Sequence, residues 1–295
     1  MHNHRDNDRI THNRAFLLGI ILNIVFVVIE VIYGLAANSS ALLADAGHNT
    51  SDILGLAFAW TAAWLATIKP SEKYTYGLKK TTILVALLNS VILIVASVFI
   101  ALGAFKKLLQ PQSVEGEQVM IIAGIGVIIN ALTALLFIKG QKDDLNIRGA
   151  FLHMAADAGI SFGVVISGLL IKLTGKMWID PVISFIIVGV IIHSIRGLFS
   201  GSVKLSLDGV PENIDSGKVR DFIMSQEGVK NLHDLHIWAM STTQVALTAH
   251  IVRSSDDNDN FIKELQESLK KKFNIGHTTF QIESENLEQT CDTGC

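Results

Sequence analysis

Two pairs of ionisable residues in this sequence share the same residue types and the same spacing. His48 and Asp52 stand in LLADAGHNTSDILG, and His153 and Asp157 stand in GAFLHMAADAGIS. Residues four apart lie on one face of a helix, with Cβ atoms roughly 5–6 Å apart. If the two stretches are facing helices, they supply two nitrogens and two oxygens. That is a tetrahedral set suited to Zn2+, with Co2+ and Cd2+ as alternatives, whereas an all-oxygen set would suit Mg2+ or Ca2+.

The elements around these pairs are long and apolar. The chain has 295 residues, of which 49% are hydrophobic and 17% charged, and its mean hydropathy is +0.42. Soluble domains carry roughly 25% charged residues. Six apolar stretches lie at about 15–37, 41–67, 80–105, 117–138, 147–172 and 179–199. Each approaches or exceeds the roughly 20 residues that cross a bilayer as a helix, so we expect an all-α transmembrane domain of six helices at 15–199.

Ionisable groups inside a bilayer are costly and usually line a functional pathway. A single His–Asp pair is as well explained by a structural salt bridge, or by a proton relay without metal. Two pairs with the same residue types and the same spacing favour a metal site. The quartet His48, Asp52, His153 and Asp157 is therefore our candidate transport site.

The loops predict the orientation. We expect no removable signal peptide before the first apolar stretch. An even number of spans places both termini on one side of the membrane. Basic residues mark the cytoplasmic side in short loops. One side collects ten of them and the other only Lys106, Lys107, Lys172 and Lys176; the ten are Arg5, Arg9, Arg14, Lys69, Lys73, Lys79, Lys80, Lys139, Lys142 and Arg148. We therefore expect both termini, including a His-containing tail at 1–14, to be cytoplasmic.

The last third of the chain is more polar than the apolar stretches before it and has a different pattern. A hinge linker at 200–210 precedes residues 211–288, whose pattern predicts a helix, two alternating strands, a second helix and a last strand. The order αββαβ indicates a small two-layer α+β domain. A domain of about 80 residues buries little surface and is marginal alone, so dimerisation would stabilise it. A Cys-containing tail at 289–295 ends the sequence.

Four stretches resemble the cation diffusion facilitator family, in particular its bacterial zinc, cadmium and cobalt efflux members. They are NSSALLADAGHNTSD, NIRGAFLHMAADAG, WIDPVIS and HDLHIW, and the resemblance covers residues 14 to 285. It implies a homodimer in the bacterial inner membrane, with six spans per subunit and a metallochaperone-like cytoplasmic domain. It also implies that the quartet is the transport site. The loop KPSEKYTYGLKK departs from members that bind a second metal there, because it has no histidine.

The cytoplasmic domain offers further candidates. The resemblance matches His233, His250 and Glu283 to positions of regulatory zinc; the alternative is surface or dimer-interface histidines. His236 stands three residues from His233, so strict strand alternation predicts opposite faces. We therefore expect His236 to be structural, near Trp238.

Weaker candidates are spread along the chain. We expect Asp45 to shape the outer mouth of the pathway or to pair with a polar group, and Glu30 to make an interhelical hydrogen bond. His277 is an additional candidate in the last strand. Cys291 and Cys295 have a C-x3-C spacing within the range of zinc sites, although a disordered tail explains them equally well.

Ligands must lose protons to bind metal, and histidine titrates near neutral pH. We therefore expect efflux of Zn2+, with Cd2+ and Co2+ as alternatives, by proton antiport with alternating access. The partners are a second copy, the lipid bilayer, metal ions and protons. The net charge of −3 argues against nucleic acid, and no phosphate-loop motif indicates a nucleotide.

Three other functions fit the sequence less well. A membrane metalloenzyme would need an open metal position, which four protein ligands do not leave. An exporter of organic cations would need aromatics around its acidic residues, and only 7% of the chain is aromatic. A pure zinc sensor would need no ligands in the bilayer.

Overall fold

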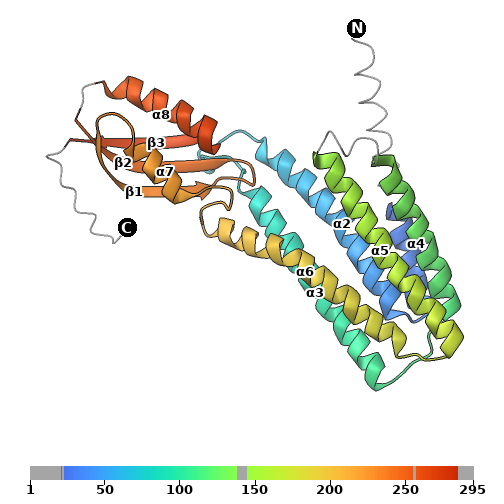
Figure 1. Cartoon of the computed structure of the whole chain (residues 1–295). Coiled ribbons are helices and arrows are strands. Elements are labelled where there is room, and N and C mark those ends of the chain that lie inside the picture. Colours follow the sequence, from blue (N-terminus) through green and yellow to red (C-terminus); the bar gives the residue numbers. More distant parts are fainter. Residues whose placement is uncertain (1–20, 22, 138–144, 255–256, 285–295) are drawn as a thin grey trace, which may run out of the picture. The chain divides into compact units, whose positions relative to one another are not determined.

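The computed structural model describes residues 21, 23–137, 145–254 and 257–284 (Figure 1). An apolar helix, Asn23–Ala36, comes first. Five long helices follow: α2 (Ser40–Ala66), α3 (Thr81–Leu109), α4 (Gly116–Phe137), α5 (Leu145–Thr174) and α6 (Ile179–Ser206). The C-terminal part contains α7 (Ser216–Met224), β1 (Val229–Ala239), β2 (Val245–Arg253), α8 (Asn258–Phe273) and β3 (His277–Glu283).

Four of the helical segments are long and apolar enough to cross a membrane. They are Thr81–Leu109, Gly116–Leu135, Met154–Thr174 and Ile179–Ser206. Many of their large side chains remain exposed, such as Phe99 at 70%, as expected where lipid surrounds a helix. The transmembrane helical domain is therefore confirmed. The count of six spans stays a prediction, because Asn23–Ala36 is shorter and α2 is not among the four segments.

By their packing, the described residues fall into two compact units. The first contains residues up to 57 together with 89–196, and the second contains 58–88 together with the residues from 197 onward. The first unit has a core that includes Phe26, Leu42, Val119 and Val164. The second has a core that includes Ile223, Leu247 and Leu265.

Helices α4 and α5 lie side by side at glycines (Figure 1). A Cβ atom at Gly168 would stand 2.6 Å from Met120 N and 2.7 Å from Gly116 O. No real Cβ atom makes contacts this short with backbone. Only a residue without a side chain permits this approach, which is common between membrane helices.

The start of α2 is held by a residue from α6. Asp180, fully buried, accepts hydrogen bonds from Ser40 N at 2.7 Å, from Ala41 N at 3.2 Å and from the Ser39 hydroxyl. The first N–H groups of a helix have no partner within the helix, and a carboxylate there is also stabilised by the helix dipole. Asp180 therefore fixes the end of α2 from which His48 and Asp52 project.

The C-terminal part is a small α/β domain with a three-stranded sheet in the order β1-β2-β3. β1 and β2 are antiparallel, and β2 and β3 are parallel. Helices α7 and α8 bury one apolar face each, with Val219 and Ile223 on α7 and Leu265 and Leu269 on α8. The Asp215 carboxylate caps α7 by accepting from Lys218 N at 3.1 Å, and this bond lowers the pKa of Asp215.

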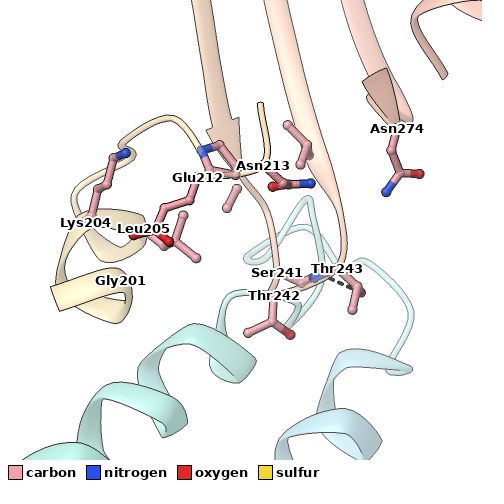
Figure 2. Close-up of a pocket in the computed structure, with 12 residues that line it drawn as sticks. Gly201, Lys204, Leu205, Glu212, Asn213, Ser241, Thr242, Thr243 and Asn274 are labelled. Atoms are coloured by element: carbon pink, nitrogen blue, oxygen red, sulfur yellow. Dashed lines mark hydrogen bonds between the residues drawn. The ribbon is translucent and has the colours of Figure 1, made fainter. Parts of the chain in front are cut away.

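Within the second unit, the loop between α2 and α3 packs against the α/β domain. The rings of Tyr76 and His277 meet edge to face at 5.5 Å, and Thr242 N donates to Thr82 Oγ1 at 3.1 Å. Lys80 Nζ lies 2.7 Å from Asp208 Oδ1. A pocket of about 220 Å³ lies beside the loop Ser241–Thr243 (Figure 2).

Candidate metal centres

Three members of the intramembrane quartet meet in the structure. His48 Nε2 lies 3.2 Å from Asp157 Oδ1 and 3.9 Å from Asp52 Oδ2. One ligand atom from each residue lies within 4.8 Å of the others. The Asp157 side chain is only 2% exposed, whereas those of His48 and Asp52 are 15% and 32% exposed. α2 and α5 therefore bring one nitrogen and two carboxylates to one point.

The fourth member, His153, lies on α5 four residues before Asp157. Its side chain is outside the described residues, so its position as a ligand stays a prediction.

Two acidic residues next to this cluster are fully buried. Glu30 and Asp45 are both 0% exposed. Glu30 Oε2 accepts a hydrogen bond from Asn49 Nδ2 at 3.1 Å, which is an interhelical bond of the kind expected for Glu30. The carboxylate of Asp45 lies beside Glu30 and Ser161. The role of Asp45 at the mouth of the pathway stays a prediction.

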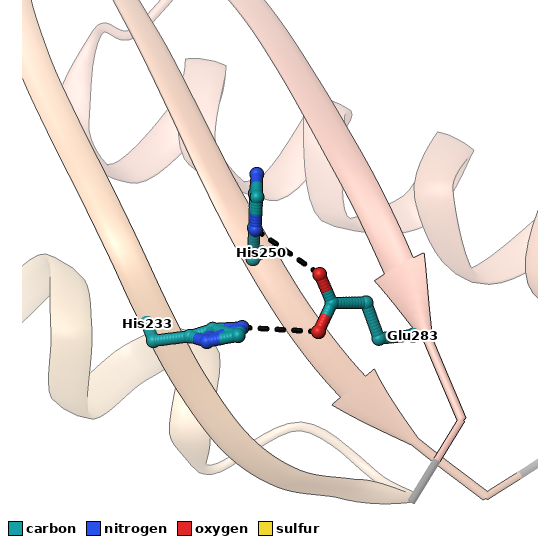
Figure 3. Close-up of side chains that lie close together, drawn as sticks. All are labelled: His233, His250 and Glu283. Carbon is teal, nitrogen blue, oxygen red and sulfur yellow. Dashed lines mark hydrogen bonds and ion pairs between the residues drawn. The ribbon is translucent and has the colours of Figure 1, made fainter. Parts of the chain in front are cut away.

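A second cluster lies on the sheet, with one residue from each strand (Figure 3). Glu283 Oε2 lies 3.1 Å from His233 Nε2, and Glu283 Oε1 lies 3.1 Å from His250 Nδ1. The two histidines stand directly opposite each other in the β1–β2 pairing. The Glu283 side chain is 1% exposed, and Gln281 Nε2 donates to its Oε1 at 2.9 Å.

This cluster fits a zinc ion. Zn2+ binds histidine nitrogen and carboxylate oxygen at roughly 2.0–2.2 Å, so neighbouring ligand atoms of a tetrahedral site stand roughly 3.3 Å apart. The two 3.1 Å separations involve different oxygens of Glu283, and one ligand atom from each of the three residues lies within 4.8 Å of the others. Two histidines and one glutamate would occupy three positions and leave a fourth for water or another ligand.

The prediction that His233 and His236 lie on opposite faces of the sheet is wrong, because β1 contains a bulge. His233 pairs with His250, but His236 pairs with Thr248. Since His250 and Thr248 are two apart on β2, they share a face, and so do their partners. The extra residue shifts the alternation of side chains along β1. Asp234, within the bulge, has a left-handed backbone conformation with a φ of 50°.

Asp234 connects His236 to the cluster. Asp234 Oδ1 lies 2.8 Å from His236 Nε2, and Asp234 Oδ2 lies 3.4 Å from His250 Nε2. The hydrogen bond with His236 is the main reason that the pKa of Asp234 lies below its ordinary value. An anionic Asp234 favours the proton of His250 on Nε2, which leaves Nδ1 free for a metal. Sequence reasoning missed Asp234, although HDLH places it between two histidines.

Of the remaining candidates, the structure describes His277, and it is not brought to either cluster. His277 begins β3 and Glu283 ends it, so the two stand at opposite ends of the strand. Cys291, Cys295 and the N-terminal histidines lie outside the described residues.

Family models match both parts of the chain. Residues 16–205 match a cation efflux transmembrane domain, and residues 211–285 match the cytoplasmic domain of cation efflux proteins. The chain belongs to the cation diffusion facilitator family.

Three bacterial relatives align with this chain over most of their own length. A cadmium, cobalt and zinc/H(+)-K(+) antiporter of Bacillus subtilis is 34% identical over 96% of this chain and 92% of its own. The metal cation efflux system protein CzcD of Cupriavidus metallidurans is 32% identical over 94% and 89%. The zinc transporter ZitB of Escherichia coli is 32% identical over 88% and 83%.

Membership of this family shows that the chain is a transporter. Cation diffusion facilitators are metal cation efflux transporters and not enzymes. Together with the apolar helices, this makes the chain a multi-pass membrane protein.

Proposed function

We propose that this protein exports Zn2+, and related ions such as Cd2+ and Co2+, from the cytoplasm in exchange for protons. The transport site is His48, Asp52, His153 and Asp157. One observation carries the proposal: His48 of α2 and Asp157 of α5 approach to 3.2 Å, with Asp52 beside them, among apolar helices. Two helices that share one ion can expose it to either side of the membrane by moving relative to each other.

Proton coupling follows from the ligands. The imidazole nitrogens and carboxylates must be deprotonated to hold the metal, and histidine titrates near the pH of the cytoplasm. A site open to the cytoplasm loads metal, and a site open to a more acidic exterior exchanges metal for protons. The name of the Bacillus subtilis relative includes K+ as a counter-ion, and we extend K+ to this chain as part of the proposal.

The cytoplasmic cluster is proposed to be regulatory. The family model for residues 211–285 supports a homodimer, and zinc held by His233, His250 and Glu283 would stabilise one arrangement of the paired domains. We place the dimer in the bacterial inner membrane with both termini in the cytoplasm.

The test is Zn2+ flux in proteoliposomes under an imposed pH gradient, comparing wild type with His48→Ala. A matched control is His193→Ala, because His193 is an exposed histidine of α6, outside the candidate transport site. We expect flux that follows the gradient, its loss in His48→Ala, and normal flux in His193→Ala. Wild-type protein that carries no Zn2+ under any gradient would contradict the proposal.

A further inference from the structure

A pocket lies where the last turns of α6 meet the small α/β domain (Figure 2). Its volume is about 220 Å³, and all of its lining residues belong to the second unit. Among these residues Pro211, Ala239 and Val245 are buried, whereas Lys204 and Glu212 are exposed. The pocket therefore has an apolar floor and a charged rim. The neutral polar members of the rim are Asn213, Thr242, Thr243 and Asn274.

The pocket lies at the level of the lipid headgroups. α6 (Ile179–Ser206) has 28 residues and is therefore about 42 Å long, close to the roughly 40–45 Å of a bilayer with its headgroups. The last turns of α6, which line the pocket, thus lie among headgroups and not in hydrocarbon. The domain that follows matches the cytoplasmic domain of cation efflux proteins, which assigns this end of α6 to the cytoplasmic leaflet. Trp60 and Trp64, exposed near the end of α2 in the same unit, are typical of this level.

The chain that follows α6 holds Lys204 in place. Asp208 has a left-handed φ of 57°, and Gly209 N then donates to Lys204 O at 2.9 Å. A Cβ atom at Gly209 would stand 2.6 Å from Lys204 Cγ and 2.8 Å from Lys204 O, so only glycine lets the backbone cross the lysine this closely. The aliphatic part of Lys204 is therefore packed by the backbone, while the side chain stays exposed at the pocket.

The other charge of the rim is also on a fixed piece of chain. Glu212 is a central residue of a tight turn at 211–214, which a hydrogen bond of 3.0 Å closes between its first carbonyl and its last N–H. The hydroxyl of Ser241 accepts from Thr243 N at 3.1 Å, which fixes the loop across the pocket. Neither Lys204 nor Glu212 forms an ion pair with any residue that the structure describes. Two opposite charges therefore line one pocket without neutralising each other.

A ligand that suits this lining carries both an anion and a cation. A phosphate accepts hydrogen bonds from the ammonium of Lys204 and from neighbouring amides and hydroxyls, whereas a primary ammonium donates to the carboxylate of Glu212. A purely anionic headgroup would be repelled by Glu212, and a quaternary ammonium has no N–H to donate. Because one water takes about 30 Å³ in the liquid, the pocket holds roughly seven waters, the size of a phosphoethanolamine group.

We propose that this pocket binds the headgroup of a membrane phospholipid of the phosphatidylethanolamine class, with the phosphate at Lys204 and the ammonium at Glu212. The site goes beyond the proposed exchange of metal for protons and does not rest on it. Because α6, the turn at 211–214 and the loop Ser241–Thr243 all line the pocket, a bound headgroup stabilises the joint between a membrane helix and the small domain.

The first test is native mass spectrometry of the purified full-length protein, delipidated in detergent and titrated with one lipid at a time. The lipids are phosphatidylethanolamine, phosphatidylglycerol and phosphatidylcholine with the same acyl chains. We expect the first equivalent of phosphatidylethanolamine to bind more tightly than the other two lipids. Glu212→Gln should remove this preference, with a loss of about fivefold, the upper range for an exposed ion pair. Lys204→Gln should weaken all three lipids, and Lys263→Gln, which changes an exposed lysine of α8, is the matched control.

The second test is thermal unfolding in the same detergent. We expect phosphatidylethanolamine to raise the Tm of wild type more than the other lipids do, and Glu212→Gln to lose this difference. Equal affinity of wild type for the three lipids, or an unchanged preference in Glu212→Gln, would overturn the site. Water-soluble glycerophosphoethanolamine at the same concentration should not displace the lipid, because it lacks the acyl chains that keep the headgroup at the membrane surface. Its displacement of the lipid would show that the pocket takes a soluble ligand and would overturn the assignment.

Discussion

The membrane cluster and the cytoplasmic cluster combine histidine and carboxylate at similar distances, but they are built differently. In the membrane, His48 and Asp52 share a face of α2 by the helical repeat, and Asp157 of α5 completes the contact at 3.2 Å. On the sheet, His233, His250 and Glu283 come from three strands, and the register of the strands alone brings them together. The first depends on local spacing and the second on strand pairing.

The two clusters also differ in their charge and in what holds them. The membrane cluster has two carboxylates around His48, so in the proposed exchange an ion there would replace protons in an apolar setting. The cytoplasmic cluster has one carboxylate between two histidines, and Asp234 holds His250 from outside. This difference suits a site that must release its ion in every cycle and a site that must retain it. Four variants test this comparison, from the largest effect to the smallest.

Asp157→Asn should have the largest effect. Its side chain is almost fully buried and contacts His48, so an amide removes both a ligand charge and the partner of the imidazole. Loss of an outer partner alone costs roughly 10–100-fold in metal affinity, so we expect Zn2+ flux to fall by more than that. Zinc binding to the cytoplasmic cluster should be unchanged, as measured by calorimetric titration. A loss at both clusters would show that they are not independent.

His250→Ala should strongly weaken zinc binding on the sheet and spare the transport site. The histidine ring bonds to Glu283 and to Asp234, so its removal leaves two ligands. We expect cytoplasmic zinc affinity to fall on the order of 100-fold, with flux persisting but no longer responding to zinc on the cytoplasmic side. His277→Ala, at the other end of β3, is the matched control. Flux that keeps its full response to cytoplasmic zinc would contradict the regulatory role.

Asp234→Asn should weaken cytoplasmic zinc binding by about tenfold. The amide no longer favours a proton on His250 Nε2, so we expect the nitrogen-15 spectrum to show a changed mixture of His250 tautomers. Because the pKa of Asp234 is lowered in the folded protein, its contribution to stability is present above the ordinary aspartate pKa. That contribution is lost only as pH falls through the lowered value. Zinc binding that weakens with an unchanged tautomer would show that Asp234 acts in another way.

Asp180→Asn should mainly affect stability. The amide keeps one acceptor oxygen of the two that serve Ser40 N, Ala41 N and the Ser39 hydroxyl. Hydrogen bonds to charged groups contribute roughly 1.5–3 kcal/mol each, so we expect a decrease of about that size in the free energy of unfolding. The measurement is thermal unfolding of the protein in detergent, with Zn2+ flux reduced only in proportion to the folded fraction. An unchanged melting temperature would show that the capping of α2 contributes little.

The sequence could predict what depends on local periodicity. Apolar stretches of sufficient length indicated the membrane helices, and the spacing of four placed His48 and Asp52 on one face. The similarity of the second pair then predicted a meeting with Asp157. The alternating stretches of the last third likewise indicated a small domain with strands and helices, because burial on one face of a sheet imposes a period of two.

What the sequence could not predict depends on contacts between distant residues. The bulge in β1 reversed the expected side of His236, because strand alternation is known only once the pairing is known. His277 stands in the same strand as Glu283 but at its other end.

The capping of α2 by Asp180 has a consequence for the alternating access that we propose. The first residues of α2 and the first turn of α6 are tied by three hydrogen bonds to one buried carboxylate, so they form a pivot. A rod held at one end sweeps furthest at the other. The gate that opens the zinc pathway widely is therefore expected at the ends of these helices remote from Asp180, and the pivot end should open only narrowly.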